Sequence, residues 1–269
     1  MIKIGDYVTR KSYNHDLVFK VIGINNNTYT LKGLDVRLIA NAEKDDLVIA
    51  EKERCKFDDE FIKKNLIFGL NRSDYFYIPG KILHLDGDKE YLQRCMDFYK
   101  ESGVMAIGKT VKEEDMHKEI VKLLNDYNPD IVVITGHDAY YKKRVGTNDL
   151  YKNSSNFIKC VKEIRKYEKS NENLIVIAGA CQSNYEELIK SGSNFASSPK
   201  RINIHALDPA IIAVSLSLQE REKNIDLINL LEKTKYGKDG IGGIKSKGMM
   251  YTGYPREEAS WIQIRLKTI

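Results

Sequence analysis

Two patterns of apolar and polar positions divide the chain. In the first 50 residues, short strand-like runs alternate with turn signals such as "NHD" and "NNN". From residue 79 onward, buried-type apolar runs alternate with longer segments whose apolar residues recur at helical intervals. The first pattern predicts a small β structure, and the second predicts a larger α/β domain.

The N-terminal part contains the strand-like runs "GDYVTRKSY", "LVFKVIGI", "TYTLKGL" and "VRLIANA". So many short strands in so few residues predict a small curled β-barrel over residues 1–52. The opening "GDYV" resembles the Tudor or KOW kind of barrel. A charged run and the helically spaced "DDEFIKKNLIFGLN" then predict a linker and helix over residues 53–78.

The predicted α/β domain covers residues 79–269. Its expected strands are "GKILHLDGD", "GVMAIGKTV", "PDIVVITGHD", "ENLIVIAGACQS" and "RINIHAL". Helical segments alternate with these strands, and the strands are almost continuously apolar. This combination predicts a mostly parallel sheet with helices on both faces. The glycine-rich run from Gly237 to Gly248 is expected to be a mobile loop near the cleft or a long connection.

The stretch "GVMAIGKT" matches the phosphate-loop pattern of nucleotide-hydrolysing enzymes. A phosphate loop needs a strand before Gly103 and a flexible loop between Gly103 and Gly108, but here a helix precedes and an apolar strand intervenes. Thr110 and Glu113 instead have the spacing of a helix capping box. We therefore interpret the match, including Lys109, as accidental, and expect no nucleotide to bind.

Composition narrows the class of protein. The chain has 269 residues, of which 42% are hydrophobic. Its formal net charge of +5 is by itself too small to indicate that the protein binds nucleic acid. Neither a signal-peptide core nor an apolar run long enough for a membrane is present, so a cytoplasmic protein without membrane partners is expected. The four cysteines are widely spaced, which argues against disulfides and against a structural metal.

Two reactive side chains follow consecutive predicted strands. His137 follows "IVVIT", and Cys181 follows "IVIAGA". Carboxyl ends of neighbouring parallel strands meet at one sheet edge, so the two residues can face each other as base and nucleophile for acyl transfer. Ser183 and Glu186 have capping-box spacing, so a helix should begin just past the cysteine and activate its thiolate. The Cys181 N–H group could then stabilise an oxyanion.

The other cysteines and histidines have weaker contexts. Cys55, Cys95 and Cys160 lie on a linker or on helices and are expected to be structural. His205 ends a later predicted strand and is the rival candidate for the base.

An apolar strand ending in Gly136-His137, followed 44 residues later by one ending in Ala180-Cys181, resembles the caspase–gingipain–clostripain clan of cysteine peptidases. The glycine precedes His137, whereas in the clan it follows the histidine, so Asp138 would supply the second oxyanion N–H. "HLDGD", "ITGHDAYY", "NLIVIAGACQSNYEELI" and "GKDGIGGIKSKG" are similar to the YabG family, the sporulation-specific peptidases of spore-forming Firmicutes.

The resemblance implies a caspase-like fold, a His137–Cys181 dyad and no cofactor. It also implies cleavage after arginine in spore-coat or germination precursor proteins, in the mother-cell cytoplasm or associated with the coat, and it leaves self-cleavage open. An arginine-binding pocket needs carboxylates, and Asp86 and Asp88 follow the first strand at the same sheet edge. The alternative is that "DGD" is only a turn.

Two other functions stay open. A nucleic-acid or protein-binding protein could use the basic N-terminal barrel, with the α/β domain as a scaffold. Its aromatic and basic residues would suit stacking and phosphate contacts: Tyr7, Arg10, Lys11, Tyr13 and Tyr29. The third possibility is the nucleotide-hydrolysing enzyme, which depends on Lys109.

Overall fold

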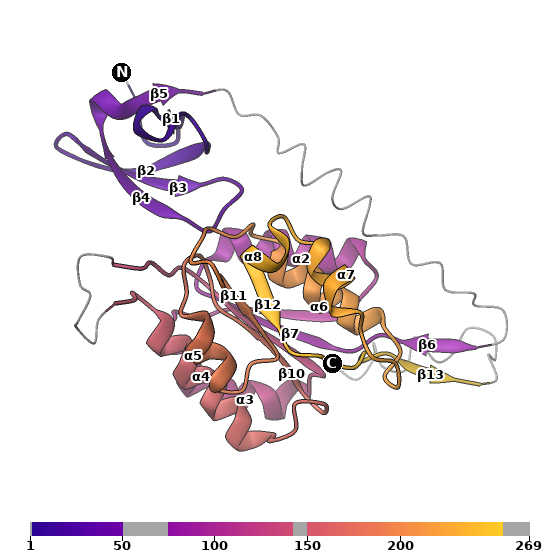
Figure 1. The fold of residues 1–269 in the computed structure, drawn as a ribbon. Coiled ribbons are helices and arrows are strands. Elements are labelled where there is room, and N and C mark those ends of the chain that lie inside the picture. The colour runs from indigo at the N-terminus through magenta and orange to yellow at the C-terminus, as the bar shows by residue number, and fades with distance from the viewer. Residues whose placement is uncertain (1, 51–74, 142–149, 255–269) are drawn as a thin grey trace.

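The structure is a computed structural model that describes residues 2–50, 75–141 and 150–254 (Figure 1). Most of the predicted linker and helix, residues 53–74, lies outside these ranges. None of the helices in the described ranges has both the length and the apolar character that crossing a bilayer requires.

The N-terminal residues form an antiparallel sheet of five strands in the order β4-β3-β2-β1-β5. The strands are β1 (Tyr7–Arg10), β2 (Phe19–Asn25), β3 (Thr28–Gly33), β4 (Ile39–Glu43) and β5 (Leu47–Ile49), with short 3₁₀ turns at Lys11–Tyr13 and Lys44–Asp46. Alternate side chains such as Val8, Phe19 and Leu31 form its own small core. The predicted β structure is confirmed; β4 and β5 lie at the two edges, and closure into a barrel stays a prediction.

The α/β domain contains a sheet of six strands in the order β12-β11-β10-β9-β7-β8. The strands are β7 (Ile82–Asp86), β8 (Ala106–Thr110), β9 (Ile131–Thr135), β10 (Ile175–Ala178), β11 (Phe195–Ser197) and β12 (Ile241–Gly243). All neighbours are parallel except β12, which pairs antiparallel with β11. The predicted mostly parallel sheet is therefore confirmed. Counted from β7, the five parallel strands follow the doubly wound order 2-1-3-4-5.

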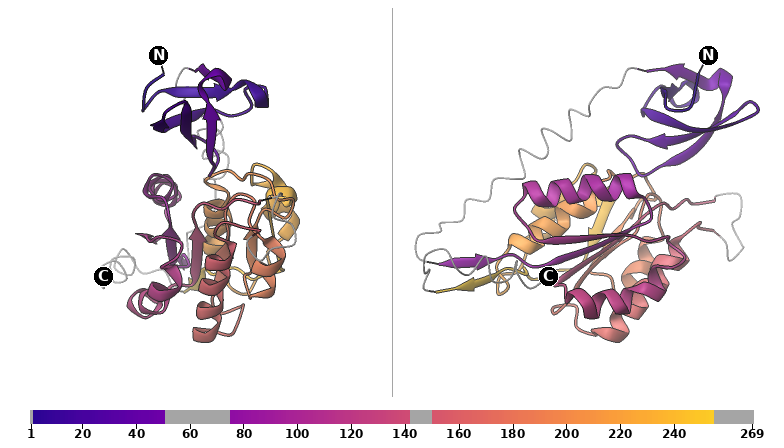
Figure 2. Two further views of the ribbon diagram at one scale, coloured as in Figure 1. Left: turned by 90° about the vertical axis from the view of Figure 1, so that its left-hand side faces the viewer. Right: turned by 180° about the vertical axis from the view of Figure 1, so that it is seen from behind.

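Helices cover both faces of this sheet, as Figures 1 and 2 show. One face carries α2 (Lys89–Glu101), α6 (Asp208–Leu218) and α7 (Leu227–Glu232), with the short α8 (Gly237–Gly240) beside them. The other carries α3 (Met116–Tyr127), α4 (Ser154–Tyr167) and α5 (Tyr185–Lys190). Every residue of α6 is buried, which explains its apolar sequence on all sides. A separate two-stranded sheet joins β6 (Phe76–Ile78) to β13 (Tyr251–Gly253).

Two expectations about strands and loops in this domain were wrong. The run "RINIHAL" is not a strand, because its backbone makes only an isolated bridge between His205 and Val36 of the N-terminal part. The Gly237–Gly248 run is not a mobile loop, because it contains α8 and β12. A Cβ on Gly243 would lie 2.4 Å from a ring carbon of Phe195, so glycine allows β12 to approach β11.

The N-terminal sheet stands at one end of the α/β domain (Figures 1 and 2). Within the described residues, its ion pairs with that domain come from β3 and the turn after it. Lys32 pairs with Asp88, and Arg37 pairs with Asp86. Because Asp86 ends β7, the N-terminal sheet meets the α/β domain at the carboxyl edge of the parallel strands.

Candidate active site

The candidate site lies where the strand order reverses. From β7 the chain continues outward to β8 and then returns to β9 on the other side of β7. Asp86 ends β7 in register with Thr135, and Ile134 of β9 is in register with Ala178 of β10. The segments that carry the predicted site residues therefore leave the sheet at neighbouring positions of one edge, where doubly wound folds bind ligands.

Hydrogen bonds fix the position of His137. Its Nε2 lies 3.1 Å from Oδ2 of Asp88, its backbone N–H donates to Oε1 of Glu113 at 2.8 Å, and its carbonyl accepts from Nδ2 of Asn153 at 2.8 Å. The ring also makes an edge-on contact with Tyr91, with 5.7 Å between ring centroids. The Nδ1 atom is buried and has no hydrogen-bond partner in the described ranges.

Asp88 serves two structural purposes at once. It is the N-cap of α2, where its carboxylate accepts the backbone N–H groups of Glu90 and Tyr91. It also forms an ion pair with Lys32 at 2.7 Å. Burial alone would raise the pKa of Asp88, but the hydrogen bonds from His137 and Lys32 outweigh it and hold the pKa well below its usual value. Asp88 is therefore an ionised acceptor.

Glu113, which the sequence placed in a helix capping box, instead contacts the backbone of His137. The expected capping box with Thr110 is wrong, because α3 begins only at Met116. Instead the carboxylate of Glu113 lies against Gly87 and Gly136, where an added Cβ would be 2.4 Å and 2.5 Å from Oε1. The available signal was the glycine in "DGD" and in "TGH", since both leave room for this carboxylate.

Cys181 is completely buried. Its sulfur accepts the N–H of Ile204 at 3.3 Å and lies 3.7 Å from the Ile204 carbonyl. Burial raises the pKa of the thiol to about 12, although the Ile204 backbone and Arg37 act in the opposite direction. In this conformation the residue is a neutral thiol.

A side-chain hydrogen bond joins the segment that follows β9 to the segment that follows β10. Ser183 Oγ donates to Oδ2 of Asp138 at 2.9 Å and accepts the Ala180 N–H at 2.9 Å. Asp138 also accepts Ser154 Oγ at 2.5 Å. The positions of the residues next to His137 and next to Cys181 are thus coupled.

Ser183 does not cap the next helix as expected, because α5 begins at Tyr185 and Asn184 is its N-cap. The N–H groups of Asp138 and Cys181 donate no hydrogen bond to any residue in the described part of the chain. Both residues are buried, Cys181 completely, so the use of these N–H groups as an oxyanion hole stays a prediction.

The two carboxylates predicted to bind a basic side chain both have partners from this chain. Asp86 is fully buried and ion-paired with Arg37, and it also accepts Thr135 Oγ1 at 2.8 Å. Asp88 binds Lys32 and His137. "DGD" is thus more than a turn, and the binding of a substrate arginine here stays a prediction.

A buried hydrogen-bond chain continues from Asp86. Thr135 donates to Asp86, so its oxygen accepts from Nε2 of His84 at 2.7 Å, and Nδ1 of His84 accepts Tyr99 Oη at 2.9 Å. Burial lowers the pKa of His84 to about 3, with the nearby Asp86 raising it and Arg37 lowering it further. His84 is a neutral core residue.

The remaining candidates lie in the core. Cys95 and Cys160 are buried, and burial raises the pKa of both thiols, that of Cys95 to about 12. These environments agree with the predicted structural roles; Cys55 lies outside the described residues. His205, the rival base, is fully buried and its Nδ1 accepts the Leu207 N–H at 3.2 Å.

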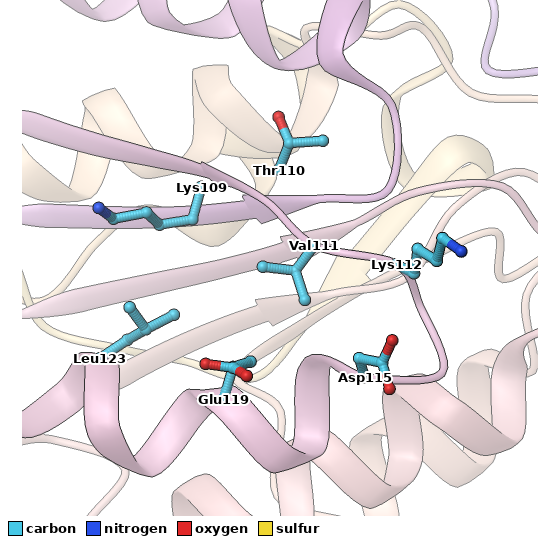
Figure 3. A pocket seen from close by; sticks show the side chains of 7 residues that line it. All are labelled: Lys109, Thr110, Val111, Lys112, Asp115, Glu119 and Leu123. Carbon is cyan, nitrogen blue, oxygen red and sulfur yellow. The ribbon is translucent and has the colours of Figure 1, made fainter.

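The phosphate-loop match forms no loop. Lys109 and Thr110 lie on strand β8, whose backbone pairs with β7, and Lys109 Nζ lies 4.8 Å from the ring centroid of Tyr127. Figure 3 shows the pocket at this place, a cavity of about 380 Å³ lined by side chains of β8, the following turn and α3. An extended strand points successive N–H groups to opposite sides, so those of Gly108, Lys109 and Thr110 do not converge on one phosphate.

Comparison with known proteins gives two kinds of match. A cobalamin-binding protein from Desulfitobacterium hafniense covers 50% of this chain and 57% of its own with a TM-score of 0.33 and 21% identity. The receiver domain of a Francisella response regulator has the same TM-score, with 22% identity over 51% of this chain and 93% of its own. These structural likenesses are too weak to carry an argument.

The sequence matches are much stronger. The chain is 40% identical to the sporulation-specific protease YabG of Bacillus subtilis (strain 168), over 94% of this chain and 98% of the relative. The sequence pattern of the family described as YabG peptidase U57 matches residues 3–71 and 63–255. The chain therefore belongs to the YabG peptidase U57 family and is a protease related to sporulation.

Proposed function

We propose that this protease is a cysteine endopeptidase in which His137 is the base and Cys181 the nucleophile, on a caspase-like α/β domain of residues 79–269. One observation carries the proposal. Asp88 binds Nε2 of His137, while Nδ1 of the same ring has no hydrogen-bond partner in the described ranges. The segment that carries His137 is also hydrogen-bonded to the segment that carries Cys181, through Asp138 and Ser183.

The protonation state follows from this contact. An ionised carboxylate only accepts hydrogen bonds, so Nε2 carries the proton of the neutral ring and Nδ1 keeps its lone pair. His137 is then oriented by a third residue, the feature that the sequence left open. This arrangement is the one that activates a nucleophile through an oriented base.

The proposed reaction has two halves. Nδ1 of His137 takes the thiol proton while Sγ of Cys181 attacks the carbonyl carbon of the scissile peptide bond. The negative oxygen of the tetrahedral intermediate is bound by the N–H groups of Asp138 and Cys181. The imidazolium then gives its proton to the leaving amine, and water, deprotonated by His137, hydrolyses the thioester.

Arginine specificity has support from the site itself. Asp86 already binds a guanidinium, that of Arg37, in a pocket where Ala206 O accepts a second hydrogen bond from the same group at 3.1 Å. Fixed acceptors around a planar guanidinium favour arginine over lysine. Spore-coat or germination precursors as substrates follow from the family resemblance, and the relative's name supports only the sporulation context.

The nucleic-acid alternative gains no support from the contacts. Arg10 stacks on Tyr13 with 3.9 Å to the ring centroid, Lys11 Nζ donates to Asp45 O at 2.6 Å, and Tyr29 is buried. These side chains contact other residues of the N-terminal sheet, so they are not free to stack on bases or to bind phosphates.

The test uses a panel of peptides with and without arginine, incubated with the full chain and with Cys181→Ala. Cys160→Ala is the matched control, because Cys160 is equally buried but lies on α4 away from any predicted base. We expect cleavage after arginine to vanish in Cys181→Ala and to persist in Cys160→Ala. Cleavage that survives Cys181→Ala would remove Cys181 from the mechanism.

A further inference from the structure

The last residue of β3 and the turn that follows it, residues 33–38, occupy the candidate site. Its Arg37 side chain is fully buried, which is unusual for an arginine and requires a charged partner. That partner is Asp86, and the ion pair is strong enough to raise the pKa of Arg37 above its ordinary value even though burial alone would lower it. We call residues 33–38 the inserted segment.

Backbone contacts hold the inserted segment as they would hold an extended peptide. Ala206 N–H donates to Asp35 O at 3.0 Å, next to the antiparallel bridge between Val36 and His205. Tyr91 Oη lies 2.5 Å from Gly33 O and 2.8 Å from Val36 O, so its single proton is shared between the two carbonyl oxygens. Pairing of main-chain groups with an extended segment, combined with a pocket for one side chain, is a common mode of peptide recognition.

The inserted segment also lies beside the candidate nucleophile. The sulfur of Cys181 accepts the N–H of Ile204 at 3.3 Å, and the next residue along the chain, His205, forms the bridge with Val36 of the segment. Burial raises the pKa of the Cys181 thiol, and the nearby charge of Arg37 opposes this rise. Cys181 has no exposed surface. A thiol in this position cannot reach the carbonyl of an external peptide.

We propose that the inserted segment is a built-in pseudosubstrate: Arg37 fills the arginine pocket formed by Asp86 and Ala206 O, and the segment must leave before a substrate binds. The assignment of this pocket to a substrate arginine rests on the proposed function. The N-terminal sheet thereby becomes the part of the molecule that keeps the protease latent. Because the segment belongs to the same chain, it competes at an effective concentration on the order of millimolar.

The charge pairing fits an exchangeable occupant. Removing Arg37 would leave the Asp86 carboxylate buried and unpaired, which is strongly unfavourable. An incoming peptide arginine would restore the same ion pair, so exchange of one guanidinium for another avoids that penalty. The acidic pocket therefore selects for arginine among possible competitors of the segment.

The experiment measures the alkylation rate of Cys181 by iodoacetamide in the full chain, with the modified peptides read by mass. Two variants loosen the segment. Arg37→Met removes the pocket occupant, and Arg94→Ala removes the hydrogen bond from Arg94 to Leu34 O while leaving Arg37 and Asp86 intact. We expect alkylation of Cys181 to be about tenfold faster with Arg37→Met, and at least about threefold faster with Arg94→Ala, given the usual strength of a hydrogen bond.

Cys160, read in the same samples, is the internal control for unfolding. Faster alkylation of Cys181 with an unchanged rate for Cys160 supports the proposal; Cys95 is not used as a control because it contacts Arg37. Arg221→Ala, which removes the ion pair with Asp130, should accelerate neither Cys181 nor Cys160. If Arg37→Met fails to fold, the alkylation rate of Cys181 in Arg94→Ala tests the proposal. An unchanged Cys181 rate in a folded Arg94→Ala chain would overturn the proposal.

Cleavage of an arginyl peptide separates this proposal from the proposed function. Selective alkylation together with faster cleavage supports both. Selective alkylation with no cleavage in any variant shows that the segment covers Cys181 but contradicts its role as a pseudosubstrate of a cysteine peptidase. Cleavage that needs Cys181 but is not accelerated in either folded variant leaves the peptidase and overturns the pseudosubstrate.

Discussion

Nε2 of His137 donates a hydrogen bond to the carboxylate of Asp88 over 3.1 Å, and Asp88 at the same time caps α2 and pairs with Lys32. A histidine that follows β9 is thus anchored to the first turn of the helix after β7. The contact selects one tautomer and one ring orientation for His137, which is what an orienting carboxylate does in a triad.

The first prediction concerns Asp88→Asn. The asparagine keeps a side-chain oxygen for the helix cap, but it can present its amide N–H to Nε2 and favour the wrong tautomer. We expect kcat/KM for an arginyl peptide to fall by about 10² to 10⁴, with a changed pH profile, as the loss of an orienting carboxylate does elsewhere. Steady-state kinetics across pH 5 to 8 (roughly the range in which histidine titrates) measure this.

Glu90→Gln is the matched control, because Glu90 also pairs with Lys32 but does not touch His137. Its exposed carboxylate should leave kcat/KM within about twofold, as exposed ion pairs contribute little. Equal losses of kcat/KM in both variants would mean that activity depends on the ion pairs of Lys32 and not on the contact between Asp88 and His137.

The second prediction concerns Glu113→Ala. Glu113 accepts the His137 N–H at 2.8 Å in the space left by Gly87 and Gly136. Its removal leaves that N–H without an acceptor and leaves a void beside His137, the proposed base. We expect kcat to fall by about tenfold, the rate effect of about 1.4 kcal/mol, with KM nearly constant.

Glu114→Ala is the neighbouring control, since Glu114 makes no hydrogen bond or ion pair in the described residues. Restoration of most activity by Glu113→Gln, whose amide oxygen can still accept, would separate positioning from charge. A Glu113→Ala enzyme with unchanged kcat would contradict the positioning role.

The third prediction concerns stability and pH through His84. Its pKa is lowered from 6.5 to about 3 by burial, so between these values the unfolded chain binds a proton that the folded chain does not. Stability is therefore fully present above pH 6.5 and is lost as pH falls below it, by up to about 1.4 kcal/mol per pH unit.

Urea unfolding of wild type and His84→Gln at a series of pH values between about 7 and 5 measures the difference. Glutamine can occupy the same hydrogen-bond chain between Thr135 and Tyr99 but does not titrate. The variant should lose less stability than wild type as pH falls. Parallel curves for the two proteins would contradict the lowered pKa, because they would show that His84 binds protons equally in the folded and unfolded chains.

The fourth prediction concerns Lys109→Ala. Lys109 lies on strand β8 above the ring of Tyr127 and has no phosphate-binding backbone beside it. We expect neither wild type nor variant to bind ATP with magnesium in calorimetry, and the free energy of unfolding to change by less than about 1 kcal/mol. Binding by wild type that is lost in the variant would restore the nucleotide-hydrolysing hypothesis.

Local sequence patterns were enough to predict most of the order of strands and helices in the α/β domain. Continuous apolar runs and helical periodicity depend on which faces are buried, and both faces of this sheet are covered. The position of His137 and Cys181 just after β9 and β10 followed from the same runs, because strands end where apolar residues end. The glycine-rich strand β12 was missed, since its pairing depends on space beside Phe195 and not on its own composition.

The sequence by itself determined the family, the α/β alternation and which reactive residues follow strands, because these depend on neighbours within one element. Only the tertiary structure decided that Asp88 orients His137, that Glu113 binds the His137 backbone and that Arg37 fills the Asp86 pocket. Those partners are 49, 24 and 49 residues apart. Contacts at such separations depend on how whole elements pack, which no local periodicity encodes.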